Sequence, residues 1–244
     1  MKKTFLVIAL FLSVAGFGQK GLYFGLGGYM GASGVVNQNT YGHPELDYAI
    51  PMSLGYHANI GYNFTEHVGL KMELGLSHLG QKYSDLRTDS ATGVDTNFAR
   101  RVKFNYFSIP VLFRYTGGGK VARFYVAAGP QMMLLLTAEQ TYTANGEPYE
   151  RTVMDKDGNP FVVGDKDIKD RISSFDIMAR IDMGVDITLV TNLVLNAGIT
   201  MGYGFLDVNA DAYKLEDYSS NYNASHNYYG GFTVGLNYYL PSKK

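Results

Sequence analysis

Apolar and polar residues alternate along much of this chain, in runs that are separated by polar or glycine-rich segments. The clearest pair of runs flanks a tight turn at residues 117–120, and each run has apolar side chains at alternate positions: Phe107, Ile109, Val111, Phe113 and Tyr115 before the turn, and Phe124, Val126, Ala128, Met132 and Leu134 after it. Side chains of a strand point alternately to its two faces, so this pattern predicts β-strands with one apolar face. Both runs exceed the length of about 5–6 residues that is typical of soluble strands. Strands of about 9–11 residues with an apolar outer face are typical of membrane β-barrels.

The same alternation predicts eight strands in all. They cover residues 21–34, 52–64, 68–79, 105–116, 121–136, 174–189, 193–204 and 228–240. Short turns follow the second, fourth and sixth strands, whereas long polar loops follow the first, third, fifth and seventh, near residues 35–51, 81–101, 137–173 and 205–227. Short periplasmic turns, long external loops and an even strand count are typical of outer-membrane barrels, in which closure leaves no free edge. We therefore predict an all-β fold, an eight-stranded antiparallel up-and-down transmembrane β-barrel with both termini on the periplasmic side.

The opposite face of these strands carries charged residues. A soluble barrel of lipocalin type would hold them outside and the apolar residues inside, but an uninterrupted apolar face of spanning length favours the membrane barrel. An eight-stranded barrel is just wide enough to be filled by its own side chains, and buried charges persist only when they are paired. We therefore expect a structural interior polar cluster, rather than a proton or ion path, formed by Lys71, Glu73, Arg114, Arg180, Asp182 and Asp186. Asp176 lies nearer the external rim and is not expected to join it.

The N-terminus has the pattern of a secretory signal peptide. A basic start precedes an apolar run at residues 5–14, and small residues follow at Gly16 and Gly18. The apolar run is shorter than the roughly 20 residues of a spanning helix, which argues against a membrane anchor. We predict that residues 1–18 are a cleaved signal peptide and that residues 19–244 form one barrel domain in the bacterial outer membrane.

The composition limits the kinds of partner and of metal or catalytic site that the chain can have. A net charge of −1 gives no indication of a nucleic-acid partner, and the absence of cysteine excludes zinc–thiolate sites and thiol catalysis. The 29 glycines and 20 tyrosines suit strands and interfacial aromatic girdles. Since the chain has no tryptophan, Tyr and Phe must form any such girdle.

No catalytic residue, cofactor site or metal site is predicted. The histidines lack the HExxH motif and paired metal spacing; they are His43, His57, His67, His78 and His226. Barrels that modify lipid A use a Ser/His/acid group at the membrane rim, where Ser77 and His78 are expected. Neighbouring strand residues point to opposite faces, so these two cannot pair as nucleophile and base. We expect a non-catalytic protein, with a narrow pore and a lipid-modifying rim hydrolase as alternatives.

The loop near residues 137–173 contains an acidic run at 155–159, followed by Asp165 and Asp167, which resembles a calcium site. An EF-hand loop needs glycine at its sixth position, whereas here it comes at the fourth. Asp157-Gly158 is a favoured tight turn between strand-like residues 149–154 and 160–163, so we favour a β-hairpin.

The loop near residues 205–227 is rich in Tyr, Asn and Ser, which are adaptable recognition residues. Its tyrosines and those that follow are Tyr213, Tyr218, Tyr222, Tyr228 and Tyr229. The last two equally suit an interfacial girdle at the start of the final strand. Partner binding by this loop and a girdle role both stay open at this point.

The chain resembles the PorT-like outer-membrane β-barrel proteins of Bacteroidetes in its signal peptide and in the runs NYFSIPVLFRYT, FYVAAGP and SFDIMARIDMGVDI. The resemblance covers essentially the whole mature chain and implies outer-membrane residence in contact with membrane lipid. Some members of this family serve the type IX secretion apparatus, but no residue here matches a motif that would carry that role. We expect the external loops or periplasmic turns to bind another envelope or secretion protein, or to support the envelope.

Overall fold

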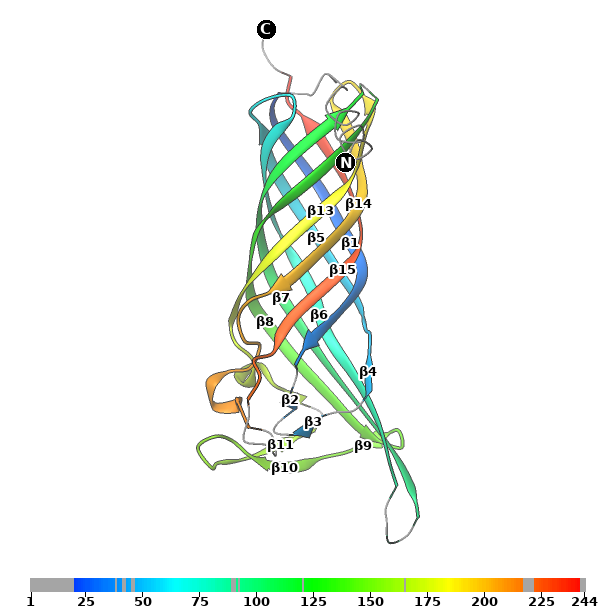
Figure 1. Cartoon of the computed structure of the whole chain (residues 1–244), viewed down its shortest axis with the longest axis vertical. Coiled ribbons are helices and arrows are strands. Elements are labelled where there is room, and N and C mark those ends of the chain that lie inside the picture. The colour runs from blue at the N-terminus through cyan, green and yellow to red at the C-terminus, as the bar shows by residue number, and fades with distance from the viewer. Residues whose placement is uncertain are drawn as a thin grey trace, which may run out of the picture.

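A closed ring of long antiparallel strands dominates the computed structural model, which describes residues 20–37, 39–40, 43–44, 47–88, 91, 93–119, 121–164, 166–216 and 222–241. Within these ranges the ring has eight members: β1 (Gly21–Val36), β5 (Met52–Asn63), β6 (Val68–Thr88), β7 (Asp95–Gly118), β8 (Ala122–Ala144), β13 (Phe175–Val190), β14 (Leu193–Gly204) and β15 (His226–Tyr239). Each strand pairs with the next in this order, and β1 pairs with β15 to close the ring (Figure 1). The predicted eight-stranded up-and-down barrel is confirmed.

Hydrophobic side chains cover the outside of this barrel. Leu26 is 70% exposed and Phe232 is 75% exposed. The other ring strands also present large exposed apolar side chains, among them Leu54, Leu74, Phe113, Met132, Ile181 and Met201. A lipocalin-type barrel would place such residues inside, so that alternative is wrong, and the exterior is suited to lipid rather than to water.

Three strands continue well beyond the ends that the sequence pattern predicts. β6, β7 and β8 contain 21, 24 and 23 residues, so residues 81–88 and 95–101, expected as loop, are paired strand. At about 3.3 Å per residue, strands of this length outrun a hydrocarbon layer of about 30 Å even when tilted. The far ends of β6, β7 and β8 therefore form a wall, and the hairpin of β6 and β7 projects farther than the rest of the barrel rim (Figure 1). Polar residues replace apolar ones on the outer face of the wall, which is why the pattern ends before the strands do.

The two ends of the barrel differ. Short connections at residues 64–67 and 191–192, and residues 119 and 121 between β7 and β8, lie at the same end as the first residue of β1 and the last of β15. The opposite end carries the short elements β2 (Asn39–Thr40), β3 (His43–Pro44), β4 (Asp47–Ala49), β9 (Glu147–Pro148), β10 (Arg151–Met154), β11 (Pro160–Val163), β12 (Lys166–Asp167), η1 (Lys169–Arg171) and η2 (Asp211–Tyr213). In the described part of the chain, no helix has the length and apolar character needed to cross a membrane.

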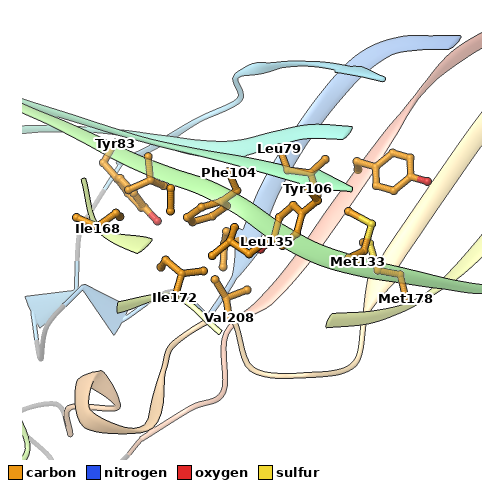
Figure 2. Packing of buried hydrophobic residues seen from close by; sticks show 14 of the residues in the cluster. Leu79, Tyr83, Phe104, Tyr106, Met133, Leu135, Ile168, Ile172, Met178 and Val208 are labelled. Carbon is orange, nitrogen blue, oxygen red and sulfur yellow. The ribbon is translucent and has the colours of Figure 1, made fainter. Parts of the chain in front are cut away.

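A hydrophobic cluster lies where the wall meets these loops. Buried side chains of β6, β7 and β8 pack there against residues of the connections on either side of β13 and β14 (Figure 2). The cluster includes Leu79, Tyr83, Val102, Phe104, Leu135, Ile168, Ile172 and Val208. We call the packed segments around η1 and residue 208 the cap, because their backbones are tied to the barrel rim: the Ile168 amide donates to the Ala138 carbonyl at 2.9 Å.

Candidate functional site

The first candidate site is the set of charged side chains inside the barrel, and Arg180 of β13 is at its centre. Its Nη1 lies 2.7 Å from Glu73 Oε2 on β6, and its Nε lies 2.8 Å from Asp182 Oδ1 on its own strand. Lys71 completes the group, with Nζ 2.6 Å from Glu73 Oε1 and 3.8 Å from Asp182 Oδ2. The strand period of two brings Lys71 with Glu73, and Arg180 with Asp182, onto the same interior face.

A second pair lies nearer the short-turn end. Arg114 Nη2 donates to both carboxylate oxygens of Asp186, at 2.6 and 2.7 Å, and its guanidinium carbon lies 4.5 Å from the centre of the Tyr125 ring. The structure therefore places all six predicted residues inside the barrel, in two groups rather than one. Exposure of these side chains is at most 7%.

Neighbouring polar groups make further contacts with the carboxylates of the network. The Thr200 hydroxyl donates to Asp182 Oδ1 at 2.6 Å, and His57 Nδ1 lies 3.4 Å from Glu73 Oε2. Asp176 is buried but separate, as expected, and accepts from Asn227 Nδ2 at 3.1 Å and from the Leu206 amide at 3.3 Å. Three cations facing three carboxylates at short range form a balanced and desolvated set of ion pairs.

The cap is a second ordered region above the barrel. Buried Arg171 of η1 stacks between Phe161 and Tyr213, with its guanidinium carbon 4.7 and 5.8 Å from the two ring centres. Its Nη2 also donates to the Val162 carbonyl at 2.9 Å, which ties the hairpin of β10 and β11 to the cap. Sequence reasoning missed this role of Arg171. The available signal was the isolated apolar residues Ile168 and Ile172 on either side of it in a polar loop.

Residues 205–216 and 222–225 complete the cap. The Tyr222 hydroxyl donates to Asp207 Oδ2 at 2.7 Å, and the same carboxylate group accepts from the Ser225 amide at 3.1 Å. Burial, together with this hydrogen bond to Asp207, raises the pKa of Tyr222 above its ordinary value. Tyr222 thus stabilises the loop itself. Tyr229 is buried inside the barrel, so the girdle role considered for it is wrong, whereas Tyr218 lies outside the described residues.

The acidic run in the long loop forms the predicted hairpin. β10 and β11 pair from Arg151 opposite Val163 to Met154 opposite Pro160, and Gly158 has φ +84° at the turn. The Asp155 carboxylate accepts from the Asn159 amide at 2.8 Å and from the Asp157 amide at 2.9 Å. These hydrogen bonds lower the pKa of Asp155, and the one from the Asn159 backbone has the largest effect.

The calcium alternative gains no support from this geometry. The Asp155 carboxylate is already engaged by its own turn. No group of three or more potential ligands that could hold a metal ion occurs among the described residues. Asp165 and the predicted signal peptide at 1–18 lie outside those residues.

The rim pair examined for hydrolase chemistry is divided between the two faces of β6. The Ser77 hydroxyl lies inside and donates to Ser108 Oγ at 3.1 Å. His78 points outward, and its Nδ1 lies 2.5 Å from Asn105 Oδ1. A histidine–amide pair is present at the rim, but Ser77 is on the other side of the sheet from it, so the two cannot act together.

Comparison with known proteins places these features in context. The family model described as "Outer membrane protein beta-barrel domain" matches residues 17–208. No match is found among curated protein sequences. Solved structures similar to this chain include OprG of Pseudomonas aeruginosa, at 11% identity over 93% of this chain and 100% of that one, with a TM-score of 0.42. Neisserial surface protein A matches at 11% identity over 90% and 97%, with a TM-score of 0.40. The attachment invasion locus protein Ail of Yersinia pestis matches at 12% identity over 91% and 100%, with a TM-score of 0.37.

Proposed function

Because the chain belongs to the outer membrane protein beta-barrel domain family, we propose that it is a non-catalytic barrel that holds a folded external platform for another envelope protein. The platform consists of the wall formed by β6, β7 and β8 beyond the membrane, together with the cap. Long loops lie outside the cell in outer-membrane barrels, so both parts face the exterior. Export by the predicted signal peptide is part of this proposal.

The observation that carries the proposal is the rigid construction of the wall. Antiparallel pairing of β6 with β7 continues without interruption from Gly75 opposite Ser108 to Thr88 opposite Asp95. External loops built from strands hold binding groups in fixed positions, which reduces the entropy lost when a partner binds.

The far end of the wall carries hydrophobic side chains that face solvent. Leu86 of β6 is 65% exposed, and Val94, which directly precedes β7 in the same hairpin, is 58% exposed. The hairpin of β10 and β11 adds Met154, which is 56% exposed. Exposed apolar side chains beyond the lipid-facing band support contact with a protein.

The resemblance of the strand runs to PorT-like proteins supports a finer form of the proposal, in which the partner is a component of a secretion apparatus. The two alternatives gain less support. A pore requires a water-filled path, but the interior is occupied by paired side chains, and such a barrel would be silent in a planar bilayer. A rim hydrolase requires a nucleophile beside His78, whereas the nearest serine in sequence, Ser77, lies inside.

A photo-cross-linking experiment tests partner binding. A photoreactive residue at Val94 is expected to yield one discrete cross-linked envelope protein in living cells, and Leu86→Asp is expected to reduce that product at least about ten-fold, because a buried charge in the contact opposes binding. The matched control is Val121→Asp, which adds the same charge at an apolar residue of similar exposure, 67%, at the opposite end of the barrel.

Both variants should keep the heat-dependent gel migration of a folded barrel. The proposal fails if Val94 captures no specific protein, or if Leu86→Asp captures the same protein as efficiently as the parent. Identification of the captured protein decides whether it belongs to a secretion apparatus.

A further inference from the structure

The side chains on the outer face of the wall change from apolar to polar at one level of the strands. Leu76, Phe107 and Leu134 lie on the apolar face of β6, β7 and β8 and form the last row that is apolar on all three strands. On β8, Leu136 lies just beyond this row, at the register shift, and is 43% exposed. The next row along the strands is His78, Asn105 and Thr137. These polar side chains are linked across the three strands: Asn105 Oδ1 lies 2.5 Å from His78 Nδ1, and Asn105 Nδ2 donates to Thr137 Oγ1 at 2.6 Å. This row marks the upper limit of the lipid-facing surface.

Three basic side chains follow directly above that row, on the same face. Lys82 pairs in register with Arg101, and Lys103 precedes the polar row on β7. Arg101 and Lys103 are exposed and Lys82 is half-buried. None of the three forms an ion pair with any of the residues that the structure describes. We call Lys82, Arg101 and Lys103 the basic rim.

The height of the basic rim matches a lipid headgroup layer. Lys103 and Arg101 come four and six residues beyond Phe107 on β7. With a rise of about 3.3 Å per residue and a tilt of about 45°, they lie roughly 9 and 14 Å above the last apolar row. Acyl chains that cover the apolar face would therefore bring their headgroups to this level.

The surface beside these residues is hollowed and has room for a ligand. A groove of about 330 Å³ runs past Lys82 and Arg101. Its other lining residues are Tyr83 and Arg100 and the short side chains Ala49, Ser84, Ala99, Thr141 and Thr143. Three acidic groups lie on the same face, none of them opposite Lys82 or Arg101. Glu139 of β8 is opposite Lys103, Asp167 of β12 is opposite Glu139, and Asp47 of β4 is opposite Ser84. The centre of the groove, at Lys82 and Arg101, is thus left basic.

We propose that the basic rim binds the phosphate groups of an anionic lipid in the outer leaflet, whose acyl chains lie on the apolar face below. Arginine and lysine are the usual phosphate ligands, and basic residues just beyond an apolar band attract anionic headgroups. Continuity of the basic rim with the lipid-facing band favours a lipid over a soluble polyanion. The site is separate from the apolar end of the wall, so it stands whether or not a protein partner binds there.

Native mass spectrometry of the detergent-purified protein, titrated with diphosphoryl lipid A, tests this site. The variant Lys82→Gln/Arg101→Gln/Lys103→Gln is expected to bind at least about ten-fold more weakly than the parent, because three phosphate contacts are lost. The control Lys156→Gln/Lys166→Gln/Lys169→Gln removes the same charge from exposed positions between β10 and β11, on β12 and on η1, and is expected to bind like the parent.

Two further probes distinguish the source of the phosphate. Dephosphorylated lipid A is expected to bind weakly to all three proteins, and inorganic tripolyphosphate is expected to compete poorly because it has no acyl chains. Equal lipid A binding by the parent and the basic-rim variant overturns the proposal. Tripolyphosphate binding as tight as that of lipid A also overturns it, in favour of a site for soluble polyanions. All substituted positions are exposed or half-buried, so each variant is expected to fold. Heat-dependent gel migration checks this for every variant.

Discussion

Replacement of Arg180 by methionine lowers the free energy of unfolding of the barrel by about 3–5 kcal/mol, the loss typical of breaking a buried ion pair. Arg180 contacts Glu73 and Asp182 at 2.7 and 2.8 Å, and these carboxylates are almost fully buried. After the substitution, Lys71 alone faces two carboxylates. The measurement is urea unfolding in lipid vesicles followed by far-UV circular dichroism, since the chain has no tryptophan for fluorescence.

Arg123→Met is the matched control for this prediction. Arg123 is also buried, at 4% exposure, but it forms no ion pair with the described residues. Its loss leaves no carboxylate unpaired, and the expected change is below about 1 kcal/mol. A triple variant that adds Glu73→Gln and Asp182→Asn to Arg180→Met should recover part of the stability. Equal losses for Arg180→Met and Arg123→Met would show that ion pairing is not what holds the interior together.

Replacement of Phe104 by alanine should open the cap while the membrane barrel stays folded. Phe104 is fully buried in the cluster that joins the wall to Ile168, Ile172 and Val208 (Figure 2). Truncation of a buried Phe to Ala costs about 3–5 kcal/mol through lost contacts and the cavity that remains. Because the cap opens as a local unit, hydrogen exchange of its amides should accelerate at least about 100-fold.

The amides to follow are those of Ser173 and Ala210, which donate to the carbonyls of Val208 and Arg171 at 2.7 and 2.9 Å. Leu86→Ala, at an exposed position on the same wall, is the control and should leave their exchange unchanged. Amides in the middle of β13 and β14 should keep their protection in both variants. Uniform loss of protection across cap and barrel would contradict the picture of a separate cap supported by a rigid barrel.

The barrel itself was predictable because membrane strands leave a strong signal. Lipid accepts only apolar side chains on the outside, and the period of two then assigns the remaining residues to the interior. For this reason Lys71, Arg114 and Arg180 were assigned to the inner face from sequence alone. Their pairing was not predictable, since Arg180 and Glu73 are 107 residues apart and meet only through the stagger of the closed ring.

The wall and the cap escaped prediction for physical reasons. Beyond the hydrocarbon layer the outer face of a strand no longer meets lipid chains, so His78, Asn105 and Thr137 end the apolar stripe while backbone pairing continues to Thr88 and Asp95. The cap depends on single apolar residues, such as Ile168 and Val208, which come from separate connections and have no periodic pattern. Their contact is set by the barrel that brings the two connections together.

Single-cysteine labelling of intact cells is the measurement that tests the central claim most directly, because the native chain has no cysteine. A membrane-impermeant maleimide should label Asp157→Cys at the exposed turn of β10 and β11, and should label Glu66→Cys in the short turn at 64–67 only after the outer membrane is permeabilised. That result would place the barrel in the outer membrane with its platform outside. Labelling of Glu66→Cys but not Asp157→Cys in intact cells, or of neither without permeabilisation, would contradict the account.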